Sequence, residues 1–142
     1  MYTWDARVRA IYRDTDQMGV VYYGNYYAWF EVGRNEFIRS LGLSYKELEE
    51  QGIMLPVIES RCVYKTPARY DDLVIVRTGI SEMTGVRIAF VYDVIRERDG
   101  TLLAQGGTVH AFTDAETFRP VNLKKRCLEY YAKLADCTRN GG

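Results

Sequence analysis

Apolar residues recur at helical spacing between positions 25 and 42. They fall at i, i+4, i+7, i+11 and i+15, and they are Tyr26, Phe30, Gly33, Phe37 and Leu41. This period of 3.6 residues predicts a long helix with one buried face. Asn25 is placed to be its N-cap, and Gly42 lies where the helix should end. Glycine inside a helix costs about 1 kcal/mol relative to alanine, so Gly33 indicates a close approach to another backbone, such as a sheet wrapped around the helix.

Alternation of apolar and polar residues predicts β-strands on both sides of this helix. A first strand is expected over Trp4–Arg13. Four more are expected over Val57–Lys65, Leu73–Glu82, Val86–Arg98 and Thr101–Thr113. Asp99-Gly100, between the last two, predicts a hairpin with a type I′ turn. Gly106-Gly107 indicates a bulge or a close backbone contact inside the last strand.

Two shorter helices complete the pattern. Ser44 and Glu47 have the spacing of a capping box, which predicts a helix to about Gln51 that Gly52 closes. A terminal helix is expected over Leu123–Leu134. One antiparallel sheet of about five strands then has a single long helix to cover. The sequence therefore predicts the α+β class, with a curved sheet wrapped around one central helix.

The length and charge of the chain limit the kinds of protein it can be. Its 142 residues suit one domain, over residues 1–142. Lys and Arg together number 19, as do Asp and Glu, which argues against a dedicated nucleic-acid or membrane surface. No apolar run approaches the roughly 20 residues of a membrane span, and Met1–Asp5 lacks the features of a signal peptide. The three cysteines have no metal-ligand spacing, so we expect reduced thiols and a cytoplasmic protein.

The loop before the long helix carries the candidate chemistry. Asp14 and Asp16 stand two residues apart there, and six aromatic residues follow within positions 22–30. A carboxylate near the start of a helix lies beside free backbone N–H groups, an arrangement that suits reactions at a carbonyl. From residue types alone, both carboxylates are better explained as loop residues that accept local N–H groups. Glu31 is a third candidate, and a pairing with Arg34 is its simpler explanation.

The run from Tyr12 to Tyr26, YRDTDQMGVVYYGNY, resembles the opening motif of the hotdog-fold acyl-CoA thioesterases. The 4-hydroxybenzoyl-CoA and YbgC-type thioesterases are the most similar branch. The segments Pro67–Asp72 and Arg119–Val121 are similar to segments of the same proteins. The resemblance extends from Trp4 to Tyr131, and it implies the hotdog fold, an acyl-CoA substrate, and neither a metal nor a bound cofactor.

The resemblance implies roles for three residues. Asp16 stands at the position of the catalytic carboxylate, which would attack the thioester carbonyl or activate a water. The backbone N–H of Tyr23 would bind the developing oxyanion. Arg87, close to the turn at Gly85, would contact the CoA phosphates. Gly24 departs from the YbgC pattern, which tends to have a histidine there, and this leaves the carboxylate without a second catalytic group.

Two other functions stay open. A hotdog hydratase or dehydratase acting on an acyl thioester usually needs a histidine together with a helix carboxylate. The only histidine, His110, falls in a strand, where we expect it to be hydrogen-bonded and structural. A related hotdog branch has its catalytic carboxylate on the long helix, which makes Glu31 the second candidate, after Asp16, for the catalytic carboxylate. A non-catalytic acyl-CoA-binding module is the other alternative.

The predicted layers also bear on assembly. One helix cannot cover both faces of a five-stranded sheet, so the far face and the edges of the sheet stay partly apolar. We therefore expect a homo-oligomer, either a dimer or a homotetramer. No nucleic-acid or membrane partner is expected.

Overall fold

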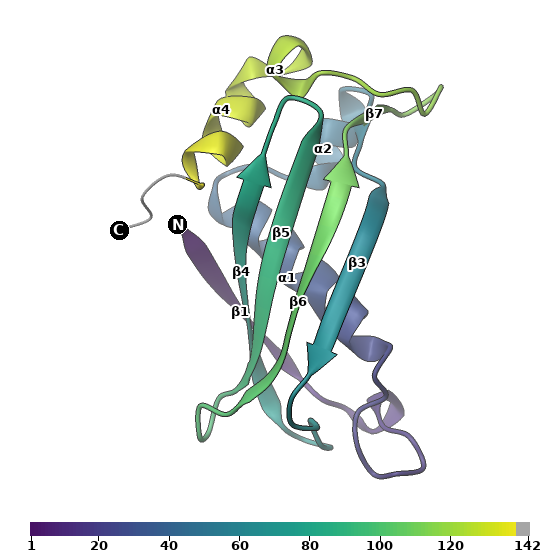
Figure 1. The fold of residues 1–142 in the computed structure, drawn as a ribbon, viewed down its shortest axis with the longest axis vertical. Helices are drawn as coiled ribbons and strands as arrows, with labels where there is room; N and C mark the ends of the chain where they lie inside the picture. The colour runs from purple at the N-terminus through teal and green to yellow at the C-terminus, as the bar shows by residue number, and fades with distance from the viewer. Residues whose placement is uncertain (139–142) are drawn as a thin grey trace.

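The computed structural model describes residues 1–138, and a long helix packs on one face of its main sheet (Figure 1). Five strands form this antiparallel sheet in the order β1-β4-β5-β6-β3, and β2 pairs with β7 in a separate two-stranded sheet. The elements are β1 (Thr3–Arg9), the 3₁₀ helix η1 (Tyr12–Asp14), α1 (Asn25–Ser40), α2 (Tyr45–Glu50), β2 (Ile53–Met54), β3 (Val57–Tyr64), β4 (Leu73–Met83), β5 (Arg87–Arg96), β6 (Leu102–Ala111), β7 (Thr113–Asp114), α3 (Leu123–Arg126) and α4 (Leu128–Asp136). The expected α+β class, with five antiparallel strands and one long helix, is confirmed.

Helix α1 packs on the sheet through the stripe that the sequence predicted. Phe30 of α1 stacks on Tyr92 of β5, with ring centroids 4.2 Å apart and ring planes 6° apart. A Cβ atom on Gly33 would lie 2.5 Å from Oγ1 of Thr78 and 2.7 Å from Cγ1 of Val76, both on β4. The expected close approach at Gly33 is therefore confirmed, because only a residue without a side chain fits there.

Gly106 of β6 makes room for the same phenyl ring from the side of the sheet. A Cβ atom on Gly106 would lie 2.6 Å from Cζ of Phe30 and 2.5 Å from the carbonyl oxygen of Arg61. The strand register is continuous through Gly106 and Gly107. Of the two features that this pair of glycines indicated, the close contact is confirmed and the bulge is wrong.

The first strand ends earlier than predicted. β1 ends at Arg9, whereas the alternation extended it to Arg13. The 3₁₀ helix η1 follows, because the carboxylate of Asp14 accepts the N–H of Ile11 at 2.9 Å and closes a turn there. The chain therefore leaves the sheet before it enters the acidic loop.

The β5–β6 hairpin is present, but its turn is not type I′. That turn needs positive φ at both central residues, and of Asp99 and Gly100 only Gly100 has it, at +72°. The loop is longer: the N–H of Arg96 donates to the oxygen of Thr101 at 2.8 Å, and the N–H of Gly100 donates to the oxygen of Arg96 at 2.9 Å. The carboxylate of Asp99 accepts the N–H of Thr101 at 3.1 Å and stabilises this longer loop.

The predicted terminal helix is two helices. α3 and α4 are separated at Cys127, whose φ of −153° and ψ of 75° are not helical. The side chain of Cys127 contacts Gln51 at the end of α2, with Sγ 3.1 Å from Oε1. The small β2–β7 sheet was not predicted either, because strands of two residues are too short to show an alternating pattern.

Gly33→Ala should destabilise the protein by about 1–3 kcal/mol, the usual cost of forcing extra volume into a packed core. Alanine is the better helix former, so the sign of the change reports the packing against β4. Chemical unfolding measures it. The loss should be smaller in a Thr78→Ala background, which removes the nearest atom. A Gly33→Ala variant as stable as the wild-type protein would contradict the close approach.

Candidate active site

The loop between β1 and α1 lies at the lower end of the molecule in Figure 1, the same end as the β5–β6 hairpin. Within this loop Thr15 bridges to Val21 in antiparallel fashion. The N–H of Asp16 donates to the oxygen of Val20 at 2.9 Å, and the N–H of Gly19 donates to the oxygen of Asp16 at 3.0 Å. Gly19 has a φ of +77°, which glycine adopts without steric cost. These contacts make the loop a tight turn with Asp16 at its base.

The two carboxylate oxygens of Asp16 are used differently, and the side chain is half-buried. Oδ1 accepts the N–H of Met18 at 2.8 Å, which fixes the orientation of the carboxylate. Oδ2 has no hydrogen-bond partner within residues 1–138. A carboxylate that is held by one oxygen and open at the other can attack a carbonyl carbon or hold a water.

Tyr23 lies two residues before α1, in a stretch where two backbone N–H groups have no hydrogen-bond acceptor within residues 1–138. The N–H of Tyr22 donates to the oxygen of Asp14 at 2.8 Å, and the N–H of Asn25 donates to the oxygen of Tyr22 at 2.9 Å. Between them, the N–H groups of Tyr23 and Gly24 have no acceptor in the part of the chain that the structure describes. Unbonded N–H groups at the start of a helix are the type of donor that stabilises an oxyanion.

The N-cap of α1 is Gly24, one residue earlier than predicted. Asn25 is instead the first helical residue, and its Nδ2 donates to the oxygen of Asp14 at 2.8 Å. A Cβ atom on Gly24 would lie 2.6 Å from Cε2 of Tyr22. Any side chain at position 24 would therefore have to displace the Tyr22 ring, which gives a physical reason for glycine there.

Asp16 and Tyr23 line the same cavity, which has a volume of about 310 Å³. Its other walls come from the loop, α1, the end of β3 and the segment after it, and they are Met18, Val20, Val21, Tyr26, Tyr64, Lys65, Thr66 and Pro67. The hydroxyl of Tyr64 donates to the carbonyl oxygen of Tyr23 at 3.0 Å, and the Tyr64 ring meets the Tyr26 ring edge-on, with centroids 5.1 Å apart. The structure thus brings together two of the three residues that the resemblance implied.

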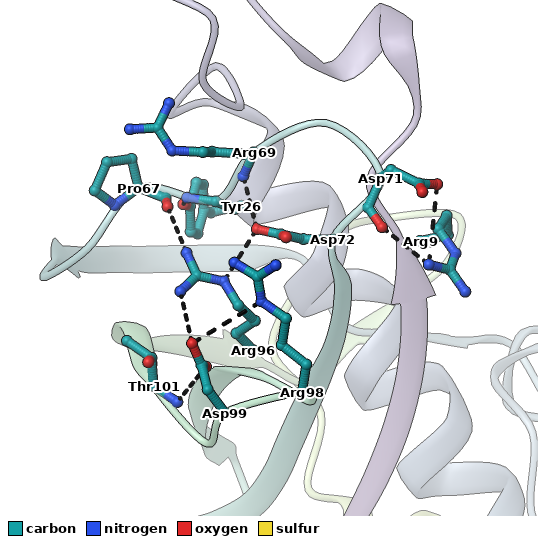
Figure 2. Close-up of polar contacts among 11 residues, drawn as sticks. Arg9, Tyr26, Pro67, Arg69, Asp71, Asp72, Arg96, Arg98, Asp99 and Thr101 are labelled. Carbon is teal, nitrogen blue, oxygen red and sulfur yellow. Dashed lines mark hydrogen bonds and ion pairs between the residues drawn. The ribbon is translucent and has the colours of Figure 1, made fainter.

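The segment Pro67–Asp72 beside this cavity is anchored by Arg96, at the end of β5. Figure 2 shows the Arg96 guanidinium between three acceptors: Oδ2 of Asp72, Oδ2 of Asp99 and the carbonyl oxygen of Pro67, each at 3.2 Å. The side chains of Arg96 and Asp72 are only 10% and 9% exposed. Local sequence patterns could not reveal this pair, because its members stand 24 residues apart.

The same segment is hydrogen-bonded to the acidic loop. The N–H of Val21 donates to the oxygen of Ala68 at 2.8 Å, and Val20 forms an antiparallel bridge with Arg69. The N–H of Ala68 in turn donates to the hydroxyl of Tyr26 at 3.2 Å. The loop, the segment and the first turn of α1 are therefore one hydrogen-bonded unit around the cavity.

Comparison with known proteins identifies the family. The sequence matches the model of the thioesterase-like superfamily over residues 12–130. The chain belongs to this superfamily. It is 35% identical over 120 residues to the acyl-CoA thioesterase YbgC of Haemophilus influenzae, which covers 83% of this chain and 86% of that protein. It is 30% identical over 128 residues to the acyl-CoA thioester hydrolase YbgC of Escherichia coli O6:H1, with 90% of each chain covered.

A solved structure agrees with these sequence matches. The DHNA-CoA thioesterase from Staphylococcus aureus is 34% identical and has a TM-score of 0.92, covering 100% of this chain and 97% of that one. The resemblance to YbgC-like hotdog thioesterases is thereby confirmed, and with it the hotdog fold. The protein is an enzyme of the thioester hydrolase class.

The two other carboxylates considered from the sequence have partners elsewhere in this thioesterase. Oδ2 of Asp14 accepts the N–H of Ile11 at 2.9 Å, the local role that the sequence favoured for it. Oε1 of Glu31 lies 3.8 Å from Nη2 of Arg34, which confirms the expected ion pair. Glu31 and Arg34 line a second cavity of about 330 Å³, which shares no lining residue with the cavity of Asp16.

Arg87 is the first residue of β5 and lies at the end of the sheet opposite to the acidic loop (Figure 1). Its backbone N–H is hydrogen-bonded to Oγ1 of Thr84 at 3.1 Å, and the residue is exposed. β5 runs for 10 residues from Arg87 to Arg96, which corresponds to about 30 Å at the usual rise of a strand. Within one chain the structure does not bring Arg87 to the Asp16 cavity, and its role in CoA binding stays a prediction.

His110 of β6 lies in the core, 1% exposed, within a chain of hydrogen bonds. Its Nδ1 is 3.0 Å from the carbonyl oxygen of Leu55, which can only accept, so we assign the proton to Nδ1. Nε2 then accepts from the hydroxyl of Thr108 at 2.9 Å, and that hydroxyl accepts from Tyr92 at 2.6 Å. Burial lowers the pKa of His110 to about 4, against the effect of the Leu55 carbonyl and with that of the nearby Arg34 cation. The expected hydrogen-bonded place in a strand is confirmed.

Three further features bear on other functions. The cysteines, Cys62, Cys127 and Cys137, are free thiols, as expected. Within residues 1–138, no group of three or more His, Cys, Asp or Glu side chains is arranged to hold a metal ion. Every helix in that range is too short or too polar to cross a membrane.

The buried His110 should make stability depend on pH. Because folding lowers the pKa of His110 from 6.5 to about 4, the unfolded chain binds a proton in this interval and the folded protein does not. The free energy of unfolding should therefore fall as the pH falls from about 6.5 to about 4, by up to about 3 kcal/mol. Urea unfolding at several pH values measures this slope. In His110→Gln the loss of unfolding free energy over this pH interval should be smaller by about 3 kcal/mol. A loss equal to that of the wild-type protein would contradict the buried neutral imidazole.

Proposed function

We propose that this thioesterase hydrolyses acyl-CoA thioesters to a free acid and CoA, with Asp16 as its catalytic carboxylate. The observation that carries the proposal is the cavity that Asp16 shares with Tyr23. Among the residues that the structure describes, Oδ2 of Asp16 and the backbone N–H of Tyr23 have no hydrogen-bond partner. An acyl-CoA substrate is supported by the names of the two YbgC relatives and of the Staphylococcus aureus thioesterase.

In the proposed reaction, the thioester carbonyl enters the cavity with its oxygen on the N–H of Tyr23. Oδ2 of Asp16 then attacks the carbonyl carbon and CoA leaves as the thiolate, or Asp16 takes a proton from a water that attacks in its place. In the first route a water hydrolyses the resulting anhydride and restores Asp16. In both routes the N–H donors of Tyr23 and Gly24 stabilise the negative charge that develops on the carbonyl oxygen.

The two alternatives are less well supported. A hydratase or dehydratase would need a histidine near the substrate, and both ring nitrogens of His110, the only histidine, are bonded within the core. Its pKa of about 4 also makes it a weak base at neutral pH. A non-catalytic binding module would leave the open oxygen of Asp16 without a task.

We further propose a homo-oligomer, a dimer or a tetramer, and a cytoplasmic location. β3 is an edge strand of the sheet, and it leaves Val57, Ile58, Val63 and Tyr64 between 43% and 49% exposed. A second copy that pairs with this edge would cover apolar surface and unpaired backbone groups. In such an assembly Arg87 would contact CoA bound at the Asp16 cavity of another copy. A monomer at micromolar concentration in light scattering would contradict this assembly.

Asp16→Asn tests the proposed catalytic role. The substitution removes the charge but keeps an oxygen that can accept the N–H of Met18, so the loop should stay folded. We expect kcat to fall at least about 100-fold, the usual scale for loss of a general base. KM should change little, because ground-state binding is not affected. The measurement is thiol release from a panel of aliphatic and aromatic acyl-CoA substrates.

Asp14→Asn and Glu31→Gln are the matched controls, and each should lower kcat less than Asp16→Asn. Should Glu31→Gln lose turnover while Asp16→Asn retains it, the active carboxylate would lie on α1 and the proposed role of Asp16 would be wrong. The absence of thiol release from every acyl-CoA tested with wild-type protein would contradict the proposed substrate class.

A further inference from the structure

We propose that Arg96 is a positioning residue for Asp16, and that it acts through the segment Pro67–Asp72. The inference rests on the proposed catalytic role of Asp16. It assigns to a buried ion pair, far from Asp16 in the sequence, the task of holding the active-site loop in its reactive geometry.

The guanidinium of Arg96 holds the segment at both of its ends. Nη2 donates to the carbonyl oxygen of Pro67, and Nε donates to Oδ2 of Asp72, each at 3.2 Å. The same Oδ2 accepts the backbone N–H of Arg69 at 2.9 Å, so the segment folds around one carboxylate (Figure 2). Pro67 also lines the Asp16 cavity. Arg96 therefore sets the position of one wall of that cavity.

Two backbone contacts then connect the segment to the loop. Ala68 accepts the N–H of Val21 at 2.8 Å, and Arg69 forms an antiparallel bridge with Val20. The carbonyl oxygen of Val20 in turn accepts the N–H of Asp16 at 2.9 Å. A displacement of the segment would therefore reach the backbone of Asp16 through the two valines.

The chemistry of the pair favours positioning over stabilisation. Desolvation of two buried charges offsets much of their attraction, so such a pair contributes little to stability. Its directional bonds nevertheless restrict geometry, and the third acceptor, Asp99, ties the guanidinium to the β5–β6 hairpin. Lysine has the same charge as arginine but lacks the planar fork that reaches several acceptors at once. A misplacement of about 1 Å at a reacting group can cost roughly 100-fold in rate.

Arg96→Lys tests the inference in the full-length enzyme. We expect kcat to fall about tenfold or more, while KM stays within about twofold. The matched control is Arg77→Lys, because Arg77 makes two bonds of 2.9 Å and 3.0 Å to Asp5 on the β1–β4 side of the sheet. That control should keep its turnover. Asp72→Asn provides a second test if Arg96→Lys does not fold, and it should show the same fall in kcat.

Two further readouts separate positioning from a loss of overall stability. In an Asp16→Asn background, Arg96→Lys should cause no further loss of kcat, because its effect passes through Asp16. Amide hydrogen exchange at Asp16 and Val21 should be faster in Arg96→Lys. Exchange at amides in the centre of β5 and β6 should stay unchanged.

The possible failures can be told apart. Full turnover in Arg96→Lys or in a folded Asp72→Asn would overturn the inference and leave the role of Asp16 intact. An additional loss in the Asp16→Asn background, or unchanged exchange at Asp16 and Val21, would also overturn it. Retained turnover in Asp16→Asn alone would show that the proposed function of Asp16, on which the inference rests, is wrong.

Discussion

Helix α1 approaches the sheet so closely that no side chain fits between them at Gly33, where a Cβ atom would overlap Val76 and Thr78. One turn earlier, Phe30 stacks on Tyr92 at 4.2 Å, above the glycine of the neighbouring strand. Contacts this short fix the helix along its axis as well as in depth, because interiors at crystal-like density do not allow sliding. The N–H groups of Tyr23 and Gly24, which precede α1 and have no acceptor within residues 1–138, are therefore held at one place relative to the sheet.

The acidic loop is placed from the other side, by the segment that follows β3. Hydrogen bonds of Ala68 with Val21 and with Tyr26 tie the loop and the helix start to the same short stretch of chain. The two aspartates of the loop have different roles. The side chain of Asp14 closes a turn, whereas Asp16 is held by one oxygen and its other oxygen has no partner in the described part of the chain. In the proposed reaction, the carboxylate of Asp16 and the N–H of Tyr23 would be the preorganised groups that hydrolysis of a thioester needs.

The elements with strong periodicity could be predicted from the sequence because their patterns are local. The stripe from Tyr26 to Phe37 and the alternation from Ile88 to Val94 are buried as expected. The type I′ turn predicted at Asp99-Gly100 was wrong because the carboxylate of Asp99 accepts the N–H of Thr101 and a bond from Arg96, and these contacts stabilise a longer loop. The break of the terminal helix at Cys127 likewise follows from packing against Gln51, which no local pattern indicates.

For the site, Asp16 and Tyr23 could be proposed only through the resemblance of the loop motif, since residue types alone favoured a local role for both aspartates. No sequence pattern indicated the pair of Arg96 and Asp72, because each is an ordinary charged residue in its local sequence and only the fold brings the two together. Arg87 shows the reverse problem. Its residue type suits a phosphate, but the topology puts it at the far end of β5 from the cavity.

The proposed reaction requires the thioester carbonyl to be held between Asp16 and the N–H of Tyr23. A crystal structure with an acyl-CoA analogue that has a methylene in place of the thioester sulfur tests it most directly, because this ligand keeps the carbonyl and cannot be hydrolysed. We expect the carbonyl oxygen about 3 Å from the nitrogen of Tyr23, and Oδ2 of Asp16 within about 3.5 Å of the carbonyl carbon or one water away. A carbonyl found in the cavity of Glu31 and Arg34 instead would contradict the proposed role of Asp16.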